Sequence, residues 1–172
     1  MTKIILPIIV IIALLLSSCS VNRKGKSTTA DNSTVDAPNE YGYNFVIFDS
    51  DGDGAKDDIA KLTCLGMSGG YGSFRLEVFT SREKSYTKVF DSEEYTIDDA
   101  TYQKLSKNID GELMIDSFYS VEAADTDGDG CEELICRQYA WAEYHANHIG
   151  NAVSMFEVSG GEVGLIEAWI ET

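Results

Sequence analysis

Residues 49–57 read DSDGDGAKD, and residues 125–133 read DTDGDGCEE. Both segments place acidic residues at their first, third, fifth and ninth positions and glycine at the fourth and sixth. Carboxylates two residues apart converge only where the backbone curls tightly, and glycine permits the positive φ angles that such a curl needs. The repeated pattern therefore predicts two tight acidic loops of one conformation.

The chemistry of these loops favours a calcium ion in each, because Ca²⁺ takes six to eight oxygen ligands in flexible geometry. Mg²⁺ demands a smaller octahedral cage, and Zn²⁺ prefers nitrogen and sulfur. A solvated acidic turn is the alternative, since Asp and Gly are common in turns, but two matches in one chain argue against coincidence. The expected ligands are the side chains of Asp49, Asp51, Asp53 and Asp57 with the Ala55 carbonyl, and the side chains of Asp125, Asp127, Asp129 and Glu133 with the Cys131 carbonyl.

The residues around the loops exclude an EF-hand. That motif needs a bidentate Glu at position 12 and a helix on either side. Position 12 is Ala60 in the first loop and Cys136 in the second. The flanking segments, such as 45–48 and 134–141, are rich in β-branched and aromatic residues, which is typical of strands. We therefore expect both loops to connect strands.

An acidic loop between two strands, with the pattern D-x-D-G-D-G-x-x-[DE]-hydrophobic, resembles the calcium loops of FG-GAP and VCBS repeats, including those of integrin α-subunit propellers. The resemblance covers nine or ten residues per loop. It implies blade-like antiparallel β units and an extracellular role in binding or adhesion. Closed propellers need about four to eight blades, whereas this chain supplies two units at most.

The predicted fold is mainly β, with two blade-like antiparallel units at about 41–95 and 112–172 joined by one short α-helix. The segment Thr96–Asp99 resembles a capping box, and Tyr102, Leu105 and Ile109 follow at helical spacing. We expect the units to pack as a small compact domain rather than a closed propeller; assembly between chains is the alternative.

The first twenty residues predict export. Ile4–Leu16 is an unbroken apolar run of about 20 Å as a helix, too short for the ~30 Å core of a bilayer. The following Leu16-Ser-Ser-Cys19 resembles the lipobox of bacterial lipoproteins. This resemblance implies a signal peptide over 1–18, lipid attachment at Cys19, and anchoring to a bacterial cell membrane or outer membrane. Residues 19–40 hold few apolar side chains and are expected to form a flexible tether before the domain at 41–172.

Charge excludes nucleic acid as a partner. The 172 residues carry a formal net charge of −16, and the domain from Tyr41 onward holds 26 acidic residues against nine Lys and Arg. Phosphate backbones are bound by Lys and Arg, so such an acidic domain repels them. An acidic excess suits a cation-binding or solvated surface instead.

The remaining constellations are weaker. Beyond Cys19, the cysteines Cys64, Cys131 and Cys136 allow at most one internal disulfide, which an exported protein can form. Cys64 with Cys136 is one such pairing, since both follow equivalent loops, although connectivity cannot be read from sequence. His145 and His148 would point to opposite faces of a strand, which disfavours shared metal ligation. Four aromatic residues either stack on sugars or belong to the core: Tyr139, Trp141, Tyr144 and Trp169.

No sequence motif marks a catalytic site. The expected function is therefore a calcium-binding cell-envelope lipoprotein with a non-enzymatic binding or adhesion role toward an extracellular protein or glycan. A calcium-stabilised exported hydrolase and a purely structural envelope protein are the alternatives.

Overall fold

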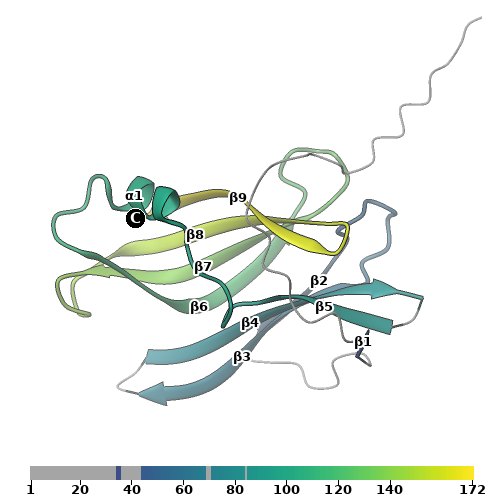
Figure 1. Cartoon of the computed structure of the whole chain (residues 1–172), viewed down its shortest axis with the longest axis horizontal. Coiled ribbons are helices and arrows are strands. Elements are labelled where there is room, and N and C mark those ends of the chain that lie inside the picture. Colours follow the sequence, from purple (N-terminus) through teal and green to yellow (C-terminus); the bar gives the residue numbers. More distant parts are fainter. Residues whose placement is uncertain (1–33, 36–43, 69–70, 84) are drawn as a thin grey trace, which may run out of the picture.

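The computed structural model describes residues 34–35, 44–68, 71–83 and 85–172 as two antiparallel sheets and one helix (Figure 1). The first sheet contains β1 (Thr34–Val35), β2 (Asn44–Phe48), β3 (Asp58–Ser68), β4 (Tyr71–Arg82) and β5 (Ser85–Asp91). The second contains β6 (Leu113–Ala124), β7 (Glu133–Ala142), β8 (His148–Ser159) and β9 (Glu162–Glu171). The segments predicted to be a signal peptide and a flexible tether, with Cys19 between them, lie almost entirely outside the described residues.

Each sheet contains a meander of four consecutive strands, and β1 adds a fifth strand to the first sheet. Strand order is β1-β5-β4-β3-β2 in the first sheet and β6-β7-β8-β9 in the second, and all neighbouring strands run antiparallel. An acidic loop joins the first and second strands of each meander, β2 to β3 and β6 to β7. The prediction of a compact, mainly β fold with one short helix is confirmed, and the described strands close no barrel.

Alternating side chains along each strand build the shared core. In β7, the alternate residues Leu134, Cys136, Ala140 and Ala142 are all buried, which is the period-two pattern of a strand with one face on the core. The rings of Phe90, Phe118 and Phe156 meet from both sheets with centroids 5.5–6.2 Å apart. Strand β6 lies against β2, β3 and β4, so the two sheets pack on each other.

Helix α1 (Asp99–Ser106) begins later than the capping box predicted. Asp98, and not Thr96, is the N-cap: its carboxylate accepts a hydrogen bond from the Thr101 amide at 2.8 Å. An extended Asp98 backbone places that carboxylate over the first turn, as an N-cap requires. Leu105 is the buried residue of the helix, while Ile109 lies beyond its end.

An ion-pair network covers part of the outer face of the first sheet. Asp91, 4% exposed, receives hydrogen bonds from the Arg75 guanidinium and from the Lys88 ammonium (Nζ–Oδ2, 2.7 Å). Burial alone would raise the pKa of Asp91, but these two cations outweigh it and lower the pKa to about 2. Asp91 is therefore held as a carboxylate at neutral pH.

The expected disulfide between Cys64 and Cys136 is wrong. Both thiols are free: Cys64 is exposed on β3, and Cys136 is fully buried on β7, where burial raises its pKa. The two side chains do not meet, because that of Cys64 is exposed to solvent whereas that of Cys136 lies in the core.

Candidate functional site

The first acidic loop folds around the carboxylate of Asp49. Its Oδ1 accepts the Gly52 amide at 2.8 Å, and its Oδ2 accepts the Gly54 amide at 2.8 Å. Two further links step along the loop: Asp53 N–H donates to Asp51 Oδ1 at 3.2 Å, and Ala55 N–H donates to Asp53 Oδ1 at 2.7 Å. Each carboxylate thus fixes the backbone two to five residues ahead of it.

The second loop repeats this pattern with a constant offset of 76 residues. Asp125 accepts the amides of Gly128 (2.7 Å) and Gly130 (3.2 Å). The Asp129 amide donates to Asp127 Oδ1 at 3.2 Å, and the Cys131 amide donates to Asp129 Oδ1 at 2.8 Å. Four equivalent hydrogen bonds show that the two loops share one conformation, as their sequences predict.

Three carboxylates converge in each loop. One oxygen each from Asp49, Asp51 and Asp53 lies within 4.8 Å of the others, and the same holds for Asp125, Asp127 and Asp129. Carboxylates this close repel one another by several kcal/mol at the effective dielectric constants of protein surfaces. Hard oxygen donors with lone pairs left over after the backbone bonds suit a calcium ion.

The acids at position nine of each loop, Asp57 and Glu133, lie outside the two groups of converging carboxylates. Asp57 is exposed and outside the first group, while Glu133 is buried and accepts hydrogen bonds from the Thr126 amide (2.8 Å) and hydroxyl (2.6 Å). In the first loop Asp58, at position ten, makes the matching contacts with the amide and hydroxyl of Ser50. The ligand roles predicted for Asp57, Glu133 and the carbonyls of Ala55 and Cys131 stay predictions.

Asp58 differs from the three converging carboxylates of the first loop because it is directed into the protein. It is 5% exposed and also accepts the Ser81 amide at 2.7 Å, which ties the first loop to β4. Burial raises the pKa of Asp58, against the lowering effect of its hydrogen bonds from Ser50 and Ser81. This carboxyl anchors the loop from within the protein.

The two loops contact each other through Glu132, at position eight of the second loop. Its amide donates to the Asp49 carbonyl at 2.7 Å, and its Oε2 accepts the Asp49 amide at 3.0 Å. Its Oε1 pairs with the Lys56 ammonium at 2.6 Å, and Lys56 is itself position eight of the first loop. The first ligand residue of one loop is therefore held by the other loop.

Gly52 is a second point at which the first loop packs against the other loop. A Cβ built on it would be 3.2 Å from Cys131 Sγ and 3.5 Å from the Gly130 carbonyl oxygen, and its φ of +72° favours glycine. Close packing and backbone conformation therefore both select glycine at this position.

The histidines form a different cluster on the second sheet. His145 Nε2 lies 2.7 Å from Asp116 Oδ2, and the Trp141 indole donates to Asp116 Oδ1 at 3.0 Å. Tyr139 stacks on both imidazoles, with centroids 4.2 Å from His148 and 5.3 Å from His145. Both imidazole rings are thus held by stacking on Tyr139, and His145 also contacts the Asp116 carboxylate.

Sequence reasoning missed Glu132, Asp58 and Lys56. Glu132 and Lys56 occupy the same loop position with opposite charges, which is the one signal that the sequence offered for a contact between the loops. Asp58 follows Asp57 directly, so spacing alone did not separate an exposed acid from a buried anchor.

These features define a class: a two-sheet, mainly β domain with a pair of like-folded acidic loops in contact. The chain belongs to the YybI C-terminal domain family, whose model matches residues 72–171. The match includes β5 to β9, nearly all of β4 and the second acidic loop, while the first acidic loop precedes it. Comparison with curated proteins and with solved structures gave no match. Within the described residues, no helix has the length and hydropathy of a membrane span.

Proposed function

We propose that this protein is a calcium-binding lipoprotein of the bacterial cell envelope, in which one Ca²⁺ ion occupies each acidic loop. The observation that carries the proposal is the repeated backbone-to-carboxylate array, which gathers three acids in each loop. Gathered carboxylates gain most from a cation when the backbone already holds them in place. Calcium is thus proposed to neutralise two loops that the fold has arranged.

The four-strand meanders with an acidic loop after their first strand support a relation to the blades of FG-GAP and VCBS repeats. By that likeness, the proposed role is non-enzymatic binding or adhesion toward an extracellular protein or glycan. The ions would stabilise the scaffold rather than carry out chemistry. Extracellular calcium modules work at dissociation constants of about 10⁻⁴–10⁻³ M, so folding would respond to external calcium.

Thermal melting of the purified full-length chain in detergent tests the calcium sites. A ligand that binds only the folded state adds about 2.7 kcal/mol at a hundredfold excess over its dissociation constant. We expect Ca²⁺ to raise Tm, EDTA to reverse the rise, and Mg²⁺ to have a smaller effect. Asp51→Asn and Asp127→Asn should each remove part of the calcium shift, and the double variant should remove all of it.

Glu94→Gln is the matched control, because Glu94 is an exposed acid outside both loops. It should keep the full calcium shift. A shift that survives in the Asp51→Asn/Asp127→Asn variant would mean that calcium acts elsewhere on this acidic surface.

The lipid anchor is proposed from Leu16-Ser-Ser-Cys19 and is tested separately. Cells expressing the full chain are fed an alkyne fatty acid, and the protein is reduced before detection so that only stable lipid attachment is scored. Labelling should require Cys19, while Cys64→Ala should label normally. Equal labelling of the Cys19→Ala variant would disprove attachment at this residue.

A further inference from the structure

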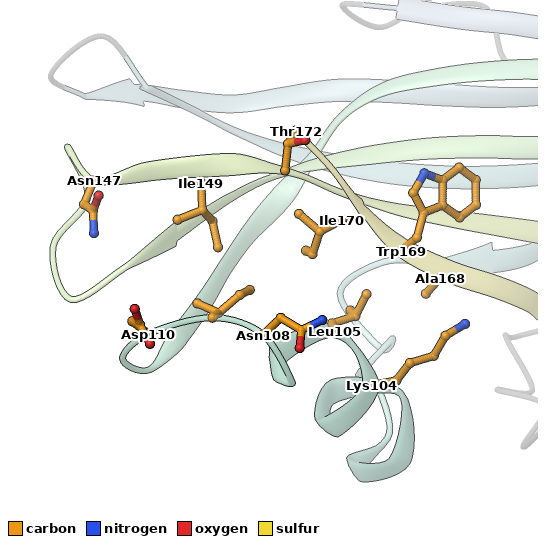
Figure 2. Close-up of a pocket in the computed structure, with 11 residues that line it drawn as sticks. Lys104, Leu105, Asn108, Asp110, Asn147, Ile149, Ala168, Trp169, Ile170 and Thr172 are labelled. Atoms are coloured by element: carbon orange, nitrogen blue, oxygen red, sulfur yellow. The ribbon is translucent and has the colours of Figure 1, made fainter.

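A pocket of about 610 Å³ lies between α1 and the β8–β9 side of the second sheet, away from both acidic loops (Figure 2). Its apolar lining comes from Leu105 and Ile109 on the helix side and from Ile149, Ala168, Trp169 and Ile170 on the sheet side. The volume falls within the roughly 300–1,000 Å³ of small-ligand sites, which are typically apolar with a few polar groups.

Small side chains underlie this part of the core. Ala140, Ala152 and Ala168 are each no more than 3% exposed and belong to the core cluster that contains Leu105. Of the three, Ala168 on β9 lines the pocket, where a larger side chain would fill part of the space. Ile149 and Ile170 are only partly buried, so their remaining surface faces this space.

The two ends of the pocket carry opposite charges. Figure 2 shows Asp110 and Asn147 at one end and Lys104 at the other, with the isoleucines between them. Within the described part of the chain, Asp110 makes no ion pair. Lys104 Nζ lies 3.7 Å from Glu167, and both side chains are more than half exposed, so this contact is weak and exchangeable.

Two asparagines add hydrogen-bonding capacity beside the apolar lining. Asn108 lines the pocket from the helix side and Asn147 from the β7–β8 turn. The Asn147 amide nitrogen donates to the Ala142 carbonyl at 3.1 Å, so its oxygen is the group available as an acceptor. Side-chain amides match the N–H and C=O groups of a peptide bond.

We propose that this pocket binds a short aliphatic peptide with free termini, its ammonium group at Asp110 and its carboxylate at Lys104. The apolar side chains would contact Ile109, Ile149 and Ile170. The whole chain carries a net charge of −16, which penalises an added anion but not a zwitterion of zero net charge. Charge complementarity at both ends therefore favours a peptide over a fatty acid of similar size.

Methyl NMR of the full-length chain in lipid nanodiscs, with labelled isoleucine δ1 methyl groups, tests this proposal. The probe is trileucine with free termini; the comparison ligands are the same peptide acetylated and amidated at its ends, and decanoate. Free trileucine should produce saturable shifts at Ile109, Ile149 and Ile170. Ile47 on β2 and Ile135 on β7 lie outside the pocket and should not move.

The charged ends give the sharpest readout. Capping the peptide should weaken binding about tenfold, and Asp110→Asn and Lys104→Gln should each weaken free trileucine severalfold while leaving the capped peptide unchanged. Glu94→Gln should have no effect on either ligand. The proposal is overturned by the absence of pocket shifts at about 10 mM free peptide, by equal affinity for capped and free peptide, or by tighter binding of decanoate.

Discussion

Single residues set the conformation of the acidic loops. Gly54 and Gly130 occupy the sixth position with φ of +87° and +93°, and a Cβ at either site would meet no other atom. Their requirement for glycine is therefore conformational and not steric. Positive φ costs an L-residue about 1–2 kcal/mol.

Gly54→Ala and Gly130→Ala should each lower the free energy of unfolding by about 1–2 kcal/mol, because the added Cβ strains the left-handed backbone. Urea denaturation of the full-length chain measures this. Gly164→Ala is the control: this β9 glycine also has open space around it but no positive φ, so alanine there should be neutral or slightly stabilising. Equal destabilisation at all three positions would contradict the explanation.

Asp91 provides a test of pH dependence. Its pKa of about 2 in the folded state lies below the ordinary value of 3.8, so its carboxylate stabilises the fold above about pH 4. That contribution of about 2 kcal/mol should disappear as the pH falls from about 4 to about 2.

Urea denaturation should show Asp91→Asn to be less stable than the parent at pH 7, with the difference closing near pH 2. Glu93, an exposed acid that pairs with the same Arg75, is the control, and Glu93→Gln should change stability far less at either pH. An Asp91→Asn deficit that persists at pH 2 would mean that its cause is packing rather than charge.

Residue patterns predicted the three acids that converge in each loop, because these acids lie within five residues of sequence and the glycines between them indicate a tight turn. They did not predict that Asp58 rather than Asp57 turns inward. The two acids are adjacent in sequence, and only the hydrogen bonds that Asp58 accepts from Ser50 and Ser81 distinguish it. The contact of Glu132 with Asp49 joins residues 83 positions apart, a separation that no local pattern encodes.

At the level of elements, the strands were predictable and their ends were not. Their content of β-branched and aromatic residues indicated strands at 45–48 and 134–141, and the structure extends the first by one residue and the second by one residue at each end. The N-cap of the helix lies two residues after the predicted Thr96, because the Asp98 carboxylate accepts hydrogen bonds from the amide and hydroxyl of Thr101.

The N-cap of α1 can be tested directly. Asp98→Ala should lower Tm by a few degrees, because it leaves the Thr101 amide without its carboxylate partner and loosens the first turn. Asp98→Asn is the control and should restore most of the loss, since asparagine is an equally good cap. The same Asp98→Ala variant should bind trileucine more weakly, since α1 forms one wall of the pocket. An unchanged Tm together with unchanged trileucine binding would refute the role assigned to this cap.

In the molecule as a whole, the acidic loops connect the two sheets. Glu132 of the second loop holds both backbone groups of Asp49 and the ammonium of Lys56, with only 13% of its side chain exposed. Ordering one loop therefore constrains the other.

Glu132→Ala should lower the free energy of unfolding by about 1–3 kcal/mol, because the largely enclosed Asp49 amide loses its acceptor. Urea denaturation measures the change. Glu122→Ala is the control, since the Glu122 side chain is 60% exposed and its partner Arg137 also pairs with Glu171, so this variant should change stability by less than about 1 kcal/mol. Similar losses for both variants would mean that the contact between the loops is not special.

Equilibrium dialysis at millimolar Ca²⁺ counts the calcium ions bound per full-length chain and so decides whether both acidic loops are calcium sites. We expect two ions for the parent chain, one for Asp51→Asn, one for Asp127→Asn, and none for the double variant. A parent chain that binds no calcium, or a double variant that still binds two ions, would contradict this expectation.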